Sequence, residues 1–338
     1  MKVVAIGGGT GLATVLRGLK NHLRGFAHPT GPEPRISRLT AVVTVTDEGG
    51  SSGRLRRDFR ILPPGDIRNC MVALAEDEKL LTQLFNYRFL SGHGLRGHSF
   101  GNLFLAALTH LTRDFAKAVR VSGEVLAIRG EIFPSTLSDV RLKAEQLNGN
   151  IIYGEARINK TRIPIQRLHI VPGRCRPLPE TLTALEQADL ITIGPGSLYT
   201  SLIPNLLVHR IPEQIARSRA LKVYVCNLMT QPGESRSYSA ADHVRALHEH
   251  AGRRLFDVAI LNTRPVSSSL RRRYAADRSE QVVNDLTEVR ALGVAPVLAD
   301  LLVEDRVVRH DSHRLATLLL KLVESRESRS RRVEESKS

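Results

Sequence analysis

The sequence predicts an α/β protein with a doubly wound, mostly parallel Rossmann-like sheet and a β-rich insertion in the middle of the chain. Two observations predict the sheet. Short runs of apolar, β-branched residues, typical of strands covered on both faces, alternate with segments whose apolar residues recur at helical spacing. Several of these runs end in a polar loop that carries glycine, which is where sheets of this class bind their ligands.

The first strand–helix–strand unit is predicted at the N-terminus. Residues 3–6 form an apolar run, residues 12–23 carry apolar side chains every three or four positions, and residues 39–45 form a second apolar run. This spacing predicts a strand, a helix and a second strand, with polar loops at 7–11 and 46–53 after the two strands.

The same pattern returns in the second half of the chain. Helices and strands are predicted in the order helix 182–188, strand 190–193, helix 211–219, strand 222–226, helix 240–250 and strand 258–261. Between the two halves, four segments have the pattern of strands with little helix between them, at 119–133, 140–147, 151–158 and 165–170. These segments predict the β-rich insertion at about residues 119–172.

The predicted organisation is one α/β domain over residues 1–322, followed by a disordered, charged tail over residues 323–338. The end of the chain is charged, rich in serine and nearly free of apolar side chains. Such a segment buries too little apolar surface to offset the entropy of ordering, which is why we expect disorder there.

The composition narrows the classes of partner. The chain carries 49 Lys and Arg against 34 Asp and Glu, a net charge of +15 over 338 residues, which suggests nucleic acid. However, aromatic residues make up only 4% of the chain and no recognition motif or zinc pattern occurs, so we expect no specific nucleic-acid partner.

The sequence also indicates where the protein works. No apolar run approaches the length of a membrane span, and the N-terminal apolar run is too short for a signal peptide. Cys70, Cys175 and Cys226 form no CxxC pair, which favours a reducing compartment. We therefore expect a cytoplasmic protein without membrane insertion.

The loop after the first predicted strand reads GGGTGL at residues 7–12. No lysine follows it as in a Walker loop, and its last position holds leucine where a dinucleotide fingerprint has glycine. Gly8, Gly9 and Gly11 nevertheless let backbone N–H groups approach an anion at the start of the next helix, and Thr10 adds a hydroxyl donor or a helix cap. A tight turn without a ligand is the alternative.

The loop after the second predicted strand combines an acid with small residues and an arginine. Its candidate ligand-binding residues are Asp47, Gly50, Ser51, Ser52 and Arg54. Glycines permit close approach of the backbone, Asp47 can accept a hydrogen bond from ribose or hold a cation, and Arg54 can pair with a phosphate.

Two further polar segments open apolar helices. Asp66 and Asn69 are candidates in the first of them, where Asp66 is either a helix N-cap or a ligand or metal residue. In the second, Ser99 is predicted as an N-cap, and His98 as a structural hydrogen-bonding residue rather than an acid–base catalyst.

The strands of the second half are followed by similar loops. Their candidate residues are Gly196, Ser197, Thr200, Asn205, Asn227 and Arg264. Ser197, Thr200 and Ser201 are spaced to direct hydroxyls at a phosphate. Asn205 can read a base or sugar edge, and Arg264 can pair with a pyrophosphate. The polar loops at the strand ends together predict a nucleotide or nucleotide-sugar ligand with more than one phosphate.

Six segments, taken in order, resemble the gluconeogenesis factor family, a branch of the CofD-like superfamily. They are GGGTGL at 7–12, VTVTDEGGSSGRLR at 43–56, LPPGDIRNCMVALA at 62–75, HSFGNL at 98–103, GPGSLYTSLIPNLL at 194–207 and NLMTQPGES at 227–235. The match extends to about residue 322. It implies a cytoplasmic bacterial protein that binds UDP-sugars, above all UDP-N-acetylglucosamine, and links carbon metabolism to cell-wall synthesis and cell shape without an established catalytic activity.

The superfamily also contains an enzyme, 2-phospho-L-lactate transferase, which transfers a phospholactyl group from a nucleotide-activated donor with magnesium. Similarity to its acidic motif makes Asp47 the candidate metal ligand, although this chain has Glu48 where the family usually has a second aspartate. Glutamate also binds magnesium but reaches further.

Two readings of the function follow from the resemblance. A UDP-sugar-binding regulator requires no cofactor beyond Mg²⁺ accompanying the nucleotide, and the alternative is a magnesium-dependent transferase. We assign no catalytic residue, because the sequence offers no obvious nucleophile or base. The resemblance also allows cell-wall regulatory proteins, and a second copy of the chain, as partners.

Overall fold

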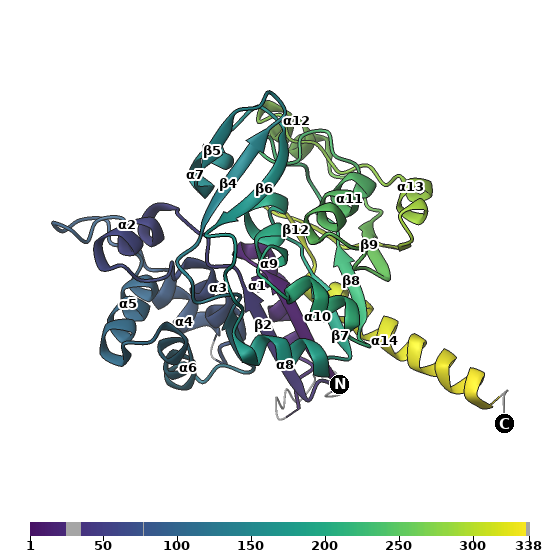
Figure 1. Ribbon diagram of the computed structural model, residues 1–338, viewed down its shortest axis with the longest axis horizontal. Helices are drawn as coiled ribbons and strands as arrows, with labels where there is room; N and C mark the ends of the chain where they lie inside the picture. Colours follow the sequence, from purple (N-terminus) through teal and green to yellow (C-terminus); the bar gives the residue numbers. More distant parts are fainter. Residues whose placement is uncertain (25–34, 77, 336–338) are drawn as a thin grey trace.

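A parallel sheet of seven strands runs through the protein, in the order β10-β9-β8-β7-β1-β2-β3. The computed structural model describes residues 1–24, 35–76 and 78–335 (Figure 1). The strands of the main sheet are β1 (Lys2–Gly7), β2 (Arg38–Val43), β3 (Glu131–Pro134), β7 (Leu190–Ile193), β8 (Leu221–Val225), β9 (Val258–Asn262) and β10 (Ala295–Ala299). This confirms the predicted doubly wound α/β fold.

The strand order changes direction at β1. The chain builds β1, β2 and β3 outward on one side and then returns to place β7 on the other side of β1. Val3 is in register with Leu39 of β2 and with Leu190 of β7, and both pairings are parallel. In such a sheet the crevice beyond the carboxyl ends of the two central strands is where ligands bind.

Helices flank the sheet in two groups. They are α1 (Gly9–Lys20), α2 (Gly50–Phe59), α3 (Gly65–Leu74), α4 (Glu78–Asn86), α5 (Phe100–Thr112), α6 (Phe115–Val125), α7 (Glu155–Ile158), α8 (Pro179–Gln187), η1 (Leu198–Leu202), α9 (Ile203–Leu206), α10 (Ile211–Arg217), α11 (Ala240–Ala251), α12 (Ser268–Ala276), α13 (Leu286–Ala291) and α14 (Ser312–Glu335). Helix α1 packs beside α3 and α14, whereas α8 packs on α10, and α9 contacts both α10 and α11. Within the described residues, no helix is both long and apolar enough to cross a bilayer.

Helix α1 forms where the spacing of apolar residues predicts it. Leu12, Leu16 and Leu19 recur on one face, and all three are fully buried. Gly18 allows α14 to pack closely, because a Cβ there would lie 2.0 Å from the carbonyl oxygen of Ser312. The helix that follows the first loop is thus held on its sheet-facing side and along α14.

The β insertion is smaller than predicted. It is a three-stranded antiparallel sheet of β4 (Arg141–Gln146), β5 (Ile151–Tyr153) and β6 (Ile165–Val171), in the order β5-β4-β6. The prediction of strand over 119–133 was wrong, because 119–125 belongs to α6, and β3 joins the main sheet. Asp114 caps α6 by accepting from the N–H of Lys117, and this cap outweighs the strand preference of the valines.

Helix α14 extends into the segment for which the sequence predicts a disordered tail. Helix α14 continues to Glu335, and only residues 336–338 of the tail lie outside the described part of the chain. The first half of this helix is anchored in the core by the buried side chains of Leu315, Leu319 and Val323. Extending a helix that is already anchored adds one backbone hydrogen bond per residue, and arginine and glutamate have high helix propensity.

Two short strands complete the described fold. β11 (Leu302–Glu304) pairs antiparallel with β12 (Val308–His310), between β10 and α14. The hydroxyl of Tyr274 on α12 accepts a hydrogen bond of 2.9 Å from the N–H of Val308. This hydrogen bond joins the hairpin to α12.

Candidate functional site

A pocket of about 380 Å³ lies at the carboxyl ends of β1 and β7, where the strand order changes direction. The segments after β1, β7 and β8 line it, together with residues of α3, α7, α12 and β12. Its lining residues are Gly8, Gly9, Thr10, Gly11, Thr14, Asp66, Glu155, Pro195, Gly196, Ser197, Ser201, Asn227, Leu228, Met229, Gln231, Tyr274, Val308, Arg309 and His310.

The glycine loop forms the wall at the start of α1. Gly9 has a φ of +61°, in the left-handed region that favours glycine. A Cβ on Gly8 would lie 2.6 Å from the Asp66 carboxylate, and one on Gly11 would lie 2.2 Å from the carbonyl oxygen of Pro195. Gly11 needs to be glycine because the loops after β1 and β7 almost touch, and Gly8 because Asp66 and Thr44 lie against it. The N-terminus of a helix of 12 residues faces the pocket here, an arrangement suited to an anion.

The loops after β7 and β8 hold each other in place. Asn227 accepts from the N–H of Gly196 at 3.1 Å and donates to the carbonyl oxygen of the same residue at 2.8 Å. Gln231 donates to the Ser197 hydroxyl at 2.9 Å. Amides and hydroxyls therefore stand in fixed positions opposite the glycine loop, where they can bind polar groups of a ligand.

The third wall comes from near the end of the chain. Arg309, an exposed residue on β12, is the only Lys or Arg among the residues that line this pocket in the described part of the chain. The adjacent His310 donates through Nε2 to the carbonyl oxygen of Cys226 at 3.1 Å, and burial lowers the pKa of the imidazole to about 4. His310 is therefore neutral at neutral pH, and Arg309 supplies the positive charge.

Sequence reasoning missed Arg309, His310 and Tyr274. None of them lies in a glycine-rich loop, and β12 has no sequence signal beyond a short apolar run. A basic residue directly after an expected strand led us to Arg264, whereas Arg309 lies within β12, a strand that we did not predict. Only the return of the chain from β10 through the hairpin brings Arg309 to the pocket.

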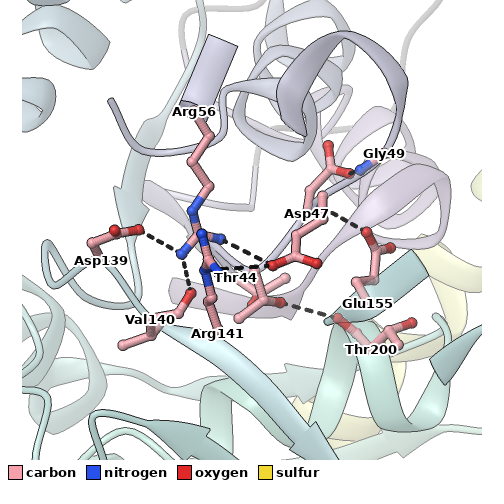
Figure 2. A network of polar contacts seen from close by, with 11 residues as sticks. Thr44, Asp47, Gly49, Arg56, Asp139, Val140, Arg141, Glu155 and Thr200 are labelled. Carbon is pink, nitrogen blue, oxygen red and sulfur yellow. Dashed lines mark hydrogen bonds and ion pairs between the residues drawn. The ribbon is translucent and has the colours of Figure 1, made fainter. Parts of the chain in front are cut away.

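Three carboxylates meet beside the glycine loop. Asp66 accepts from the backbone N–H of Gly9, and burial, followed by repulsion from Asp47, raises the pKa of Asp66 to about 7. Glu155 reaches from the inserted sheet to accept from the N–H of Glu48 at 2.8 Å (Figure 2). Burial and then Asp47 raise the pKa of Glu155 well above its usual range. Burial and repulsion from Asp47 thus favour the protonated forms of Asp66 and Glu155.

The inserted sheet is positioned by a buried arginine. Arg56 on α2 donates to the carboxylate of Asp139 and to the carbonyl oxygen of Val140, just before β4 begins (Figure 2). Its side chain is buried, so the contact fixes the sheet that carries Glu155 against α2. Arg56 was not among the predicted binding residues.

About half of the predicted binding residues line the pocket. These are Gly8, Gly9, Thr10, Gly11, Asp66, Gly196, Ser197 and Asn227. Asp47 is not among the lining residues, and its carboxylate packs against the start of α3, where a Cβ on Gly65 would lie 2.3 Å from it. Asp66 is not a helix cap, because the N-cap of α3 is Pro64.

A second group of predicted residues holds helices together. The Ser51 hydroxyl hydrogen-bonds Nδ1 of His98 at 2.9 Å, and the Ser52 hydroxyl accepts from Asn102 at 3.2 Å. Asn69 accepts from Arg68 at 2.7 Å. Gly50 begins α2, and Arg54 lies one turn into it, beside Gly97. Ser99 caps α5 by accepting from the N–H of Asn102, as predicted.

The remaining predicted residues lie away from the pocket. Thr200 is buried and donates to Glu234 at 2.6 Å, whereas Ser201, which we predicted beside it, lines the pocket. Arg264 is exposed after β9 and is not among the lining residues. Asn205 is fully buried, and its amide donates to the carbonyl oxygens of Gly7 at 3.2 Å and Ser201 at 2.8 Å.

Asn205→Ala is expected to lower the free energy of unfolding by about 1–3 kcal/mol, because it removes the two buried hydrogen bonds that the Asn205 amide donates to the carbonyl oxygens of Gly7 and Ser201. Chemical denaturation of parent and variant measures this. Asn86→Ala, at an exposed position on α4, is the matched control and should change stability little. Equal stability of parent and Asn205→Ala would contradict this structural role.

Known proteins resemble the chain over most of its length. A family model described as "2-phospho-L-lactate transferase CofD" matches residues 3–302. A gluconeogenesis factor of Bacillus subtilis is 44% identical, with 95% of this chain and 98% of that protein covered. A putative gluconeogenesis factor of Nostoc sp. is 51% identical over 95% of this chain and 68% of that protein.

The chain belongs to the gluconeogenesis factor branch of the CofD family. A solved structure supports the same assignment. It is a protein member of the UPF0052 family from Bacillus halodurans, 44% identical, with a TM-score of 0.88, and the match covers 95% of this chain and 100% of that chain. The resemblance drawn from the sequence motifs is therefore confirmed, as is the fold of this CofD-family chain.

Mg²⁺ is the metal ion that the similarity to 2-phospho-L-lactate transferase implies for this site. Carboxylate oxygens are the ligands that Mg²⁺ prefers, and a cation beside Asp47, Asp66 and Glu155 would offset the repulsion that helps to raise the pKa values of Asp66 and Glu155. Within the described residues, however, no three or more His, Cys, Asp or Glu side chains are arranged to hold a metal by themselves. Mg²⁺ commonly binds through one or two carboxylates plus substrate phosphates, so the residues suit an ion that arrives with a phosphate ligand.

The carboxylate cluster of this CofD-family chain predicts a pH effect on stability. The pKa of Asp66 rises from 3.8 to about 7 in the folded state, so between these values the folded protein binds more protons than the unfolded one. Its free energy of unfolding should therefore fall as pH rises through this window, and Glu155 should contribute in the same direction. Glu155→Gln is expected to lose less stability over this range than the parent.

Urea denaturation of the metal-free protein at a series of pH values tests this prediction. The compared quantity is the change in the free energy of unfolding with pH. The difference in this change between parent and variant reports Glu155, since the other groups titrate in both proteins. Glu186→Gln removes an exposed carboxylate on α8 and should behave as the parent. If the free energy of unfolding depends on pH in the same way in Glu155→Gln and in the parent, the pKa of Glu155 is not raised in the folded protein.

Proposed function

We propose that this chain is a cytoplasmic regulatory protein that binds a UDP-sugar, with UDP-N-acetylglucosamine as the first ligand to test. As a gluconeogenesis factor, it would link carbon metabolism to cell-wall synthesis and cell shape. The observation that carries the proposal is the pocket between β1 and β7, with the glycine loop on one wall and Arg309 on another. The relatives named gluconeogenesis factor support the regulatory role.

The pocket has groups for each part of such a ligand. Backbone N–H groups at the start of α1 suit the pyrophosphate, and Arg309 adds a fixed positive charge. Ser197, Asn227 and Gln231 offer hydroxyl and amide groups to a sugar or base. Tyr274, partly buried at the other side, provides a ring face.

A magnesium-dependent transferase is the second candidate. The carboxylates beside the glycine loop favour it, because they can hold Mg²⁺ next to a bound pyrophosphate. When bound, the ion would neutralise phosphate charge and polarise a phosphoryl oxygen. One or two of Asp47, Asp66 and Glu155 would hold it together with the ligand phosphates, and no residue of the pocket is assigned as nucleophile or base.

Isothermal titration of the full chain with UDP-N-acetylglucosamine, UDP-glucose and GDP, each with and without Mg²⁺, tests the proposal. We expect saturable binding of a UDP-sugar, and mass spectrometry of the incubated mixture should show the ligand unchanged. Absence of UDP-sugar binding would contradict the proposal. Consumption of a nucleotide-activated donor, with transfer to an added acceptor, would replace it by the transferase function.

A further inference from the structure

A second, smaller pocket of about 230 Å³ adjoins the first. Three segments far apart in the chain form its walls: the turn after α7, the loop after β8 and the C-terminal end of α12. The same segments also line the first pocket, through Glu155, Gln231 and Tyr274. The two pockets are therefore neighbours along all three segments.

The second pocket is strongly basic. Lys160, Arg162, Arg236 and Arg278 line it, and Asp277 is the only acid among its lining residues in the described part of the chain. All four cations are exposed, and none has an ion-pair partner among the described residues. Like charges around one hollow repel each other, so an anion with two or more negative charges would lower the free energy of this arrangement.

The backbone that carries these side chains is fixed. Gly233 packs so closely on the turn after α7 that a Cβ there would lie 2.3 Å from the carbonyl oxygen of Asn159. The loop after β8 is joined to the segment after α12, since the N–H of Thr230 donates to the carbonyl oxygen of Glu280 at 2.7 Å and the Thr230 hydroxyl accepts from the N–H of Glu280 at 3.0 Å. Arg278 has a φ of +58°, rarely adopted by a residue other than glycine. The pocket walls are thus held together before any ligand binds.

We propose that this second pocket binds a small phosphate-class anion, such as inorganic pyrophosphate or the phosphate of a phosphorylated metabolite. Arginine guanidinium groups match phosphate oxygens in geometry and charge. The pocket is smaller than the roughly 300 Å³ at which sites for drug-sized ligands begin, and none of the described residues that line it has an aromatic side chain to stack on a base. These features favour a compact anion over a second nucleotide. This proposal is independent of the UDP-sugar proposal.

Titration calorimetry of the full chain with inorganic pyrophosphate at constant ionic strength tests the site. We expect saturable binding that Arg162→Glu and Arg236→Glu each weaken about tenfold or more, because each change replaces an attractive charge by a repulsive one. Arg272→Glu, an equal charge change at an exposed position of α12 outside the pocket, is the matched control and should have less than about a twofold effect.

Three results would overturn the site. One is the absence of saturable pyrophosphate binding in the parent. Another is an equal loss in Arg272→Glu, which would indicate attraction by the general surface charge. The third is loss of pyrophosphate binding in Arg309→Ala with none in Arg162→Glu, which would place the anion at the glycine loop of the first pocket.

The same titrations with UDP-N-acetylglucosamine distinguish two sources of the anion. It is either a group of the ligand in the first pocket or a separate molecule. If Arg162→Glu weakens binding of the UDP-sugar as well, the anionic group belongs to the ligand of the first pocket and extends into the second. If the parent binds both compounds at once, the anion is a separate molecule. Failure of UDP-N-acetylglucosamine to bind the parent would contradict only the proposed function, because pyrophosphate binding is measured without it.

Discussion

Arg309→Ala is expected to weaken binding of a UDP-sugar by about 10- to 100-fold, the range for loss of a hydrogen bond to a charged group. The side chain lies on β12 and is exposed, and among the described residues it is the only lysine or arginine that lines the first pocket. Its removal should leave the free energy of unfolding nearly unchanged, because the arginine makes no ion pair within the described part of the chain. Titration calorimetry and denaturation measure the two quantities.

Two variants make this prediction specific. Arg306→Ala removes an exposed arginine from the turn of the same hairpin, outside the pocket, and should bind as the parent does. Arg309→Lys keeps the charge but loses the planar guanidinium, so it should bind with intermediate affinity. If Arg309→Ala binds the UDP-sugar as tightly as Arg306→Ala, the ligand does not contact this wall of the pocket.

Gly11→Ala is expected to lower both stability and ligand affinity. A Cβ at this position would lie 2.2 Å from the carbonyl oxygen of Pro195, and a backbone atom cannot move aside as the end of a flexible side chain can. Overpacking of this kind costs about 1–3 kcal/mol, which offsets the gain of about 1 kcal/mol that alanine brings over glycine within a helix. The variant must also separate the loops after β1 and β7, so UDP-sugar binding should fall below detection.

Gly173→Ala is the control for this substitution. Its Cβ would have no neighbour closer than 3.7 Å, from the carbonyl oxygen of Ile170, so both stability and binding should match the parent. Thermal unfolding with and without ligand reports both effects, since a bound ligand raises the unfolding temperature. A Gly11→Ala variant that retains the parent's ligand-induced shift would show that the contact between the two loops is not needed for binding.

Most of the fold could be predicted because the signals were local. The strands at 190–193 and 258–261 are apolar runs buried on both faces, and their neighbours carry helical spacing. The predictions were wrong where the secondary-structure preference of the residues disagrees with their capping and packing in the fold. The valines of α6 favour a strand, but the cap from Asp114 and the packing of α6 on β3 select a helix.

The binding residues were predicted with less success, for a different reason. Glycines such as Gly8 and Gly11 were recognisable because close approach of two loops leaves few alternatives to glycine. Asn205 and Thr200 have the right chemistry for a ligand, yet their donors are used by buried protein acceptors. Whether a polar side chain faces a pocket or the interior depends on neighbours that the residue type does not reveal.

The sequence by itself determined the fold class, the family, and the glycine loop at the start of α1, because each rests on residues that are adjacent in the chain. Only the tertiary structure decided which charges act together. It brought Arg309 from β12 and Glu155 from the inserted sheet to the glycine loop, and it gathered Lys160, Arg236 and Arg278 around the second pocket. The physical reason is that charge interactions depend on distance in space, and these residues are separated by long stretches of chain.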